Sequence, residues 1–215
     1  MRKIKFANGE FYHVYNRGAD KRKVFLDRYD FDRFLQGMCE FNSVKPIGSI
    51  YENSFRDQKS LLRDRVPKLV NILCYCLNPN HFHMVLEQAT DGGISEFMKR
   101  TSSGYTAHFN FKHKRSGVLF QGPFKACHIS SNEYLLHISA YVNLNDQVHK
   151  LGGSIFKSSW EEYTSTKNTV NFCKKDIVLE QFNDKKEYQR FATNALKGAL
   201  ERKQLKRELE NLLLE

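Results

Sequence analysis

The spacing of hydrophobic and polar positions predicts four strands in the first 130 residues. Residues 11–17 are mostly aromatic or β-branched and precede a glycine, which is typical of a strand that enters a turn. Residues 68–77 and 81–87 have the same character and flank an Asn-Pro-Asn turn, so they predict a β-hairpin. A shorter strand is expected at residues 124–129.

Three other stretches have a helical period. Residues 30–41 place hydrophobic side chains three and four positions apart and carry acidic residues in the first turn. Residues 94–113 show a similar period, and residues 133–144 follow a Ser-Ser-Asn sequence that can cap a helix. The polar stretch 52–68 is expected to lie outside the core.

The order strand, helix, strand, strand, helix, strand, helix favours an α+β fold of the ferredoxin-like or RRM-like class. In this class an antiparallel sheet has helices packed on it, here expected on one side. A Gly-Gly-Ser sequence suggests a boundary between a first domain, 1–154, and a mostly helical C-terminal extension, 155–215.

Leucines recur at helical intervals near the C-terminus and predict one long amphipathic helix over about the last thirty residues. The heptads are not sustained, so packing of this helix against the main domain is favoured over dimerisation. Both a monomer and a homodimer stay open.

Among the features of the composition, only the net charge indicates a class of partner. The 215 residues include 34 Lys and Arg against 24 Asp and Glu, which gives a formal charge of +10, and 40% hydrophobic content excludes a disordered chain. A basic protein favours a polyanion such as nucleic acid, because binding releases counterions. The candidate DNA-binding residues are Arg17, Lys21, Arg22, Lys99, Arg100, Lys112, Lys114, Arg115 and Lys125.

Six of these nine basic residues lie in an unusual segment. Residues 97–125 contain no acidic side chain and are interleaved with six aromatic ones. Exposed aromatic rings can stack on unpaired bases. At least half of these rings are nevertheless expected in the core.

Cysteine content and hydropathy point to a cytoplasmic protein without a membrane span. The five cysteines are odd in number and scattered, unlike a disulfide framework, and no apolar run approaches the ~18 residues of a transmembrane helix. Cys74 and Cys76 alternate on one strand and resemble half of a zinc site, but no second pair has a useful spacing.

Candidate chemistry lies on the predicted hairpin and on the helix that follows the last strand. His81 and His83 are two residues apart on a strand, which sends both imidazoles to the same face. His137, Tyr141 and Asn145 are spaced by four and are expected on one helical stripe. Two imidazoles and an amide oxygen leave open positions on a divalent cation, which suits phosphoryl transfer on nucleic acid.

The same residues carry a resemblance to a known family. NPNHFHMVL (78–86) looks like the "(M)PNHFHLLL" segment of single-tyrosine HUH transposases, in particular the REP-associated tyrosine transposases that act at repetitive extragenic palindromes. The resemblance extends over roughly residues 9–192. Its further matches are YTAHFN (105–110), SGVLFQG (116–122), YVNLN (141–145) and SSWEEY (158–163).

The resemblance implies a metal-dependent endonuclease and strand transferase acting on single-stranded DNA that forms hairpins at palindromic repeats. His81, His83 and Asn145 would be the ligands of Mg²⁺ or Mn²⁺. Tyr141 would be the nucleophile that forms a 5′-phosphotyrosine and releases a 3′-OH. Tyr105 is a rival nucleophile, although it has no amide four residues later. His137 is a candidate proton acceptor, with a solvated surface histidine as the simpler interpretation.

Three positions depart from the family pattern. Pro123 stands where the family usually has Arg, Asn143 replaces a His, and Asp146 replaces a Pro. The first departure removes one expected contact with DNA, and none removes a proposed ligand. Two other functions stay open: a non-catalytic nucleic-acid-binding module in which the histidine pair is structural, and a relaxase-like or replication-initiating nuclease.

Overall fold

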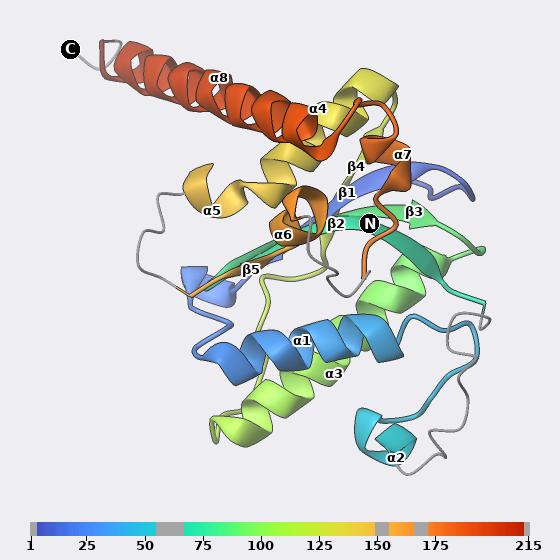
Figure 1. The fold of residues 1–215 in the computed structure, drawn as a ribbon. Coiled ribbons are helices and arrows are strands. Elements are labelled where there is room, and N and C mark those ends of the chain that lie inside the picture. Colours follow the sequence, from blue (N-terminus) through green and yellow to red (C-terminus); the bar gives the residue numbers. More distant parts are fainter. Residues whose placement is uncertain (1–3, 55–66, 149–154, 166–171, 213–215) are drawn as a thin grey trace.

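A five-stranded antiparallel sheet organises the chain (Figure 1). The computed structural model describes residues 4–54, 67–148, 155–165 and 172–212, with side chains up to residue 201. Within these ranges the strand order is β4-β1-β3-β2-β5, and every neighbouring pair is antiparallel. The strands are β1 (Phe11–Arg17), β2 (Val70–Asn78), β3 (His81–Gln88), β4 (Lys125–Ile129) and β5 (Lys157–Ser158).

The α+β fold and the order of the first seven predicted elements are confirmed. Each predicted helix lies within about two residues of its expected bounds, and several short elements join them. The helices are η1 (Ala19–Lys21), α1 (Arg28–Glu40), α2 (Ile50–Ser54), α3 (Gly93–Lys112), α4 (Asn132–Asn143), α5 (Asn145–Val148), α6 (Trp160–Thr164), α7 (Asp176–Leu179) and α8 (Lys185–Leu212).

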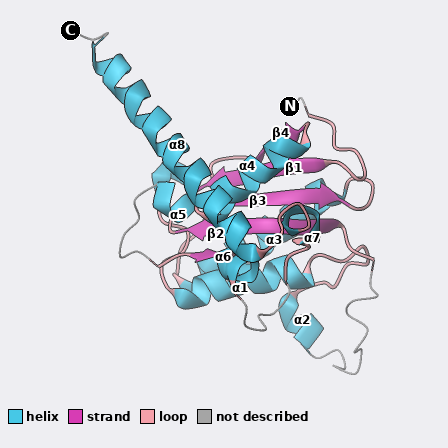
Figure 2. Cartoon of the chain, turned by 45° about the horizontal axis from the view of Figure 1, so that its top comes forward, coloured by secondary structure: helices cyan, strands magenta, loops and turns pink. Residues whose placement is uncertain are grey.

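The expectation that helices cover one side of the sheet is wrong, because they cover both. Helices α1 and α3 pack on one face, whereas α4, α6 and α8 lie on the other (Figures 1 and 2). The central strand β3 and its neighbour β2 are buried almost throughout their length. A strand that alternates poorly between hydrophobic and polar side chains is typical of a sheet buried on both faces.

Local capping explains where the tyrosine-bearing helix α4 begins and ends. The Ser131 hydroxyl accepts a hydrogen bond from the Tyr134 amide at 3.1 Å, as predicted for an N-cap. At the other end Leu144 leaves the helical conformation, with φ −110° and ψ 22°, and a separate helix, α5, begins at Asn145. Tyr141 and Asn145 therefore belong to two different helices.

The C-terminal extension completes the second face of the sheet. Strand β5 pairs with β2, and the Tyr163 hydroxyl donates to the Leu73 carbonyl at 2.8 Å. The predicted long helix is present as α8, and its first part packs on α4 through buried Tyr188 and Ala192. The boundary near residue 155 stays a prediction, although residues after it share this core. No helix in the described part of the chain is long and apolar enough to cross a membrane.

The expectation for residues 52–68 concerns a stretch that is only partly described. Residues 52–54 end α2 and are exposed or half-buried, while residues 55–66 lie outside the described residues.

Candidate active site

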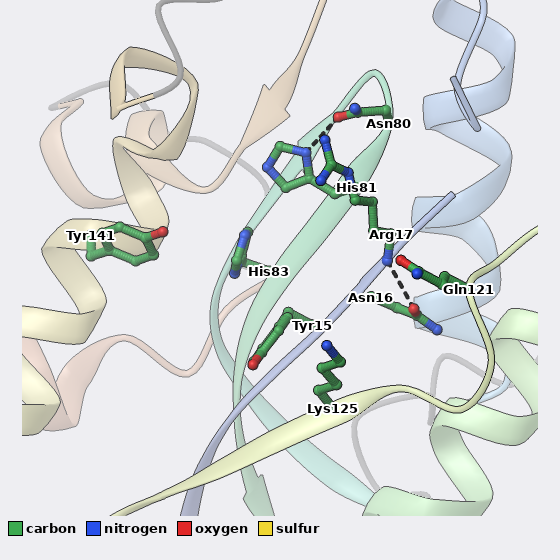
Figure 3. A pocket seen from close by; sticks show the side chains of 9 residues that line it. All are labelled: Tyr15, Asn16, Arg17, Asn80, His81, His83, Gln121, Lys125 and Tyr141. Carbon is green, nitrogen blue, oxygen red and sulfur yellow. Dashed lines mark hydrogen bonds between the residues drawn. The ribbon is translucent and has the colours of Figure 1, made fainter. Parts of the chain in front are cut away.

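The histidine pair lies at the start of β3 and faces α4. His81 and His83 are each 9% exposed, whereas Phe82 between them is fully buried in the core under α1 and α3. Both imidazoles line a pocket of about 540 Å³, and Tyr141 lines it from the side of α4 (Figure 3). The pocket is lined by Tyr15, Asn16, Arg17, Asn80, His81, His83, Gln121, Lys125 and Tyr141.

Asn145 meets His81 in spite of the break in the helix. Its Oδ1 lies 3.1 Å from His81 Nε2 and accepts a hydrogen bond from Asn78 Nδ2 at 2.8 Å. Asn78 Nδ2 also lies 3.0 Å from His81 Nε2. All three side chains are buried. The tertiary fold thus brings together two of the three predicted ligands, from β3 and α5.

The prediction that His137, Tyr141 and Asn145 form one helical stripe is wrong. The helix breaks at Leu144, so Asn145 is placed by α5. His137 is exposed, and its ring centroid lies 5.2 Å from that of Phe191 on α8. His137 therefore sits on the flank of α4 that faces the extension, and it is not among the residues lining the pocket.

The two candidate nucleophiles lie on opposite faces of the sheet. Tyr141 is half-buried, and its ring centroid lies 5.8 Å from that of His83 in an edge-on arrangement. Tyr105 is buried between α1 and α3, where its hydroxyl donates to the Val24 carbonyl. Burial raises the pKa of Tyr105. Only Tyr141 of these two faces the histidine pair.

Two residues on β1 that contact His83 were missed in the sequence analysis. His13 Nε2 lies 2.8 Å from His83 Nδ1, and burial lowers the pKa of His13 to about 4, so this imidazole is neutral at pH 7. The Tyr15 ring centroid lies 5.5 Å from that of His83, and burial raises the pKa of Tyr15. Their spacing of two already placed both on one face of the predicted strand. The missing information was that β1 pairs with β3.

Hydrogen bonds around His81 define which of its nitrogens carries the proton. Asn80 Nδ2 donates to the Lys21 carbonyl at 3.3 Å, which turns Asn80 Oδ1 toward His81 Nδ1 at 2.6 Å. An amide oxygen only accepts, so Nδ1 of a neutral His81 holds the proton and Nε2 carries a lone pair. The hairpin turn thereby orients one imidazole for ligation.

This donor set fits a divalent cation. His81 Nε2 and Asn145 Oδ1 are then two acceptors only 3.1 Å apart, close to the edge of an octahedron with bonds of about 2.1 Å. The Nδ2 atom of Asn145 is buried without a hydrogen-bond partner among the described residues. No three His, Cys, Asp or Glu side chains within the described ranges converge on a metal site. Imidazole and amide groups would hold the ion, with the remaining positions open to phosphate or water.

The predicted basic residues are divided between the two faces of the sheet. Arg17 and Lys125 line the pocket, and Lys21 and Arg22 lie at the 3₁₀ turn beside it. The remaining five belong to α3, on the other face, or to the turn after it: Lys99, Arg100, Lys112, Lys114 and Arg115.

Several of these cations already have partners within the chain. Arg100 pairs with Glu96 at 2.8 Å and donates to the Ser43 carbonyl. Lys112 pairs with Asp27 at 2.7 Å and with Asp30 at 2.8 Å, which ties α3 to α1. These contacts within the chain explain the presence of Arg100 and Lys112 without any contact with DNA.

Most of the aromatic rings in the basic segment are structural. Phe97, Tyr105, Phe109 and Phe120 are buried, as expected for at least half of the six, whereas Phe111 is 88% exposed. Phe124 is half-buried and packs against the main core.

The cysteine pair on β2 does not form a zinc site with other described residues. Cys74 and Cys76 are fully buried among hydrophobic side chains, and burial raises the pKa of both thiols. The half-site interpretation is not supported by any third ligand in the described part of the chain.

A buried hydrogen-bond network fixes the tyrosine helix to the extension. Asn143, which departs from the family pattern, donates to the Tyr188 hydroxyl at 2.9 Å and accepts from the Ser159 hydroxyl at 2.6 Å. Ser159 also accepts from the Tyr75 amide of β2 at 2.9 Å. Helix α4 is thus anchored to β2, to α8 and to the segment before α6, two residues from Tyr141.

Part of the chain matches a known protein family. Residues 63–145 match the family of IS200-like transposases. The IS200-like segment includes the hairpin, α3, α4 and all four predicted catalytic residues, so the resemblance seen in the sequence is confirmed there. No curated protein matches the chain.

A solved structure has a similar fold. It is a REP-associated tyrosine transposase bound to a REP hairpin, with a TM-score of 0.52, 11% sequence identity, and coverage of 77% of this chain and 86% of that one. At this identity the likeness is one of fold, and it extends beyond the IS200-like segment.

Proposed function

We propose that this protein is a metal-dependent endonuclease and strand transferase of single-stranded DNA, a transposase that uses Tyr141 as its nucleophile. The observation that carries the proposal is the approach of Asn145 Oδ1 to within 3.1 Å of His81 Nε2, beside a pocket in which Tyr141 lies edge-on to His83. The expected ion is Mg²⁺ or Mn²⁺, held by His81, His83 and Asn145. When bound, it would supply Lewis-acid polarisation of the scissile phosphate.

The proposed covalent step uses the hydroxyl group of Tyr141. Its hydroxyl oxygen attacks a backbone phosphorus and loses its proton, while the bond from phosphorus to the 3′ oxygen breaks and that oxygen takes up a proton. The products are a 5′-phosphotyrosine and a free 3′-OH. Attack by the 3′-OH of another strand reverses these bonds and joins the DNA without ATP, since the phosphodiester energy is kept in the tyrosyl ester.

The substrate we propose is single-stranded DNA that folds into a hairpin at palindromic repeats. The chain carries a formal charge of +10, and Arg17 and Lys125 line the pocket beside the histidine pair. These cations can contact the phosphates on either side of the cut. The similar structure has a REP hairpin bound, which supports the same class of DNA here.

The decisive test is a covalent adduct that depends on Tyr141. Hairpin oligonucleotides drawn from palindromes beside the gene are labelled at the 3′ end, because the protein stays on the 5′ phosphate of the downstream fragment. With Mn²⁺ or Mg²⁺ we expect an SDS-resistant labelled band that is lost with EDTA, in Tyr141→Phe and in His81→Ala.

Two matched variants separate this nucleophile from its neighbours. Tyr105→Phe removes a hydroxyl on the other face of the sheet, and Tyr15→Phe removes one within the pocket. Both should still form the adduct. An adduct that survives Tyr141→Phe but is lost in Tyr105→Phe or Tyr15→Phe would overturn the assignment. DNA retardation without any adduct, unaffected by metal or by Tyr141, would instead indicate a non-catalytic binding module.

A further inference from the structure

His13 and His83 form a hydrogen bond across the sheet. His13 on β1 pairs with Val85 of β3, so it reaches His83 diagonally, and its Nε2 lies 2.8 Å from His83 Nδ1. The rings are inclined by only 17° with centroids 5.1 Å apart, so the contact joins their edges. One of the two nitrogens therefore donates a proton and the other accepts it.

The direction of this hydrogen bond decides whether His83 can bind a cation. If His13 donates, His83 Nδ1 holds the accepting lone pair, and the proton of a neutral His83 is on Nε2. If His13 accepts, the proton of His83 is on Nδ1 and Nε2 carries a lone pair. Imidazoles that ligate metals almost always donate their second N–H to an acceptor. Only the second arrangement fits a ligand.

His81 shows the same arrangement with a different acceptor. Its Nδ1 faces Asn80 Oδ1 at 2.6 Å, and that amide is held by the Lys21 carbonyl. In both histidines of the pair Nδ1 thus faces a neighbouring side chain, an amide oxygen from the hairpin turn for His81 and an imidazole from β1 for His83.

We infer that His13 is a positioning residue that accepts a hydrogen bond from the Nδ1 proton of His83. The lone pair of His83 is thereby kept on Nε2, where it can bind the cation. The inference deepens the proposed function and rests on it, because it takes His83 to be a ligand. It adds to the two ligands of β3 a third buried histidine that does not itself touch the ion.

The tautomers can be measured in the wild-type protein without metal. Two-bond ¹H–¹⁵N correlation spectra of protein with ¹⁵N-labelled histidine distinguish imidazoles protonated on Nδ1 from those protonated on Nε2. We expect His83 to be protonated on Nδ1 and His13 to have an unprotonated Nε2. A His83 protonated on Nε2, with His13 donating, would overturn the inference, and this result requires no variant to fold.

Variants at position 13 test the consequence for metal affinity. His13→Phe keeps a planar ring but has no acceptor, and Mn²⁺ affinity measured by the EPR signal of the free ion should fall about 10–100-fold. His13→Gln offers a carbonyl acceptor and should recover much of this loss. His128→Gln is a control at an exposed histidine that pairs with Glu10, and it should bind Mn²⁺ like the wild type. Circular dichroism melts confirm that each variant is folded.

The outcomes separate this inference from the proposed function. Unchanged Mn²⁺ affinity in His13→Phe, or equal loss in the Phe and Gln variants, would reject the role of His13 while the adduct of the wild type still stands. A wild-type protein that binds no Mn²⁺ and forms no adduct would reject the proposed function, and the tautomer of His83 would still show which ring donates.

Discussion

The two faces of strand β3 are buried to a similar degree but have opposite chemistry. Phe82 and Met84 are fully buried under α1 and α3, and the Phe82 ring packs against those of Phe34 and Phe120. His81 and His83 are nearly as buried on the other face, yet their nitrogens have polar partners from β1, the hairpin turn and α5. Burial alone therefore does not distinguish a core from a site. The partners of each side chain do.

The largest expected difference between the faces is in activity. His83→Ala should reduce adduct formation by about 10³-fold or more, because it removes a proposed ligand and with it about 4 kcal/mol of transition-state stabilisation. Single-turnover rates with the hairpin oligonucleotide measure this loss. If His83→Ala keeps activity within tenfold of the wild type, the face of β3 toward α4 has a structural role, like the face toward α1 and α3.

The opposite face should respond in stability. Phe82→Ala empties a fully buried site among aromatic rings and should lower the free energy of unfolding by about 3–5 kcal/mol, as measured by urea denaturation. Phe82→Leu serves as the matched control and should lose less. A loss below about 1 kcal/mol in Phe82→Ala would show that this face is not the tightly packed core described here.

The basic residues offer a smaller contrast in DNA affinity. Lys125→Ala should weaken binding of single-stranded DNA several-fold and reduce the dependence of affinity on salt by about one phosphate contact, since Lys125 lines the pocket. Lys99→Ala, which changes an exposed side chain of α3 on the other face of the sheet, should change neither quantity. Titrations at several salt concentrations measure both quantities. An equal loss of affinity in the two variants would mean that DNA contacts both faces of the sheet.

The smallest effect concerns the ion pair between α1 and α3. The hydrogen bond from Lys112 lowers the pKa of Asp27 below its usual value, so the ionised carboxylate contributes stability at neutral pH. This contribution is present above the unfolded pKa of about 3.9 and is lost as pH falls through the lower folded value. Asp27→Asn keeps an N-cap residue, so its stability should fall below that of the wild type at pH 7 and converge with it in acid. A difference that does not vary with pH would mean that charge is not involved.

The spacing of hydrophobic and polar residues determined much of the secondary structure of this protein. The spacing of His81 and His83 placed both imidazoles on one face. Side-chain pattern also predicted strands β1 to β4, helices α1, α3 and α4 and the N-cap of α4, because these signals act within a few residues of each other. The short helices η1 and α2 were not predicted. The motif around the histidines also carried the resemblance to transposases. The match of residues 63–145 to the IS200-like transposase family confirms it.

Only the tertiary structure decided which elements meet. A period gives the direction of a side chain from its own element, but strand pairing and helix placement set its partner. Pairing of β1 with β3 brought His13 to His83, packing placed Tyr105 on the far face, and the break at Leu144 sent Asn145 to His81 while leaving His137 beside α8. These contacts join residues between 64 and 81 positions apart in the chain, or depend on a change of helix axis, and neither is encoded in local spacing.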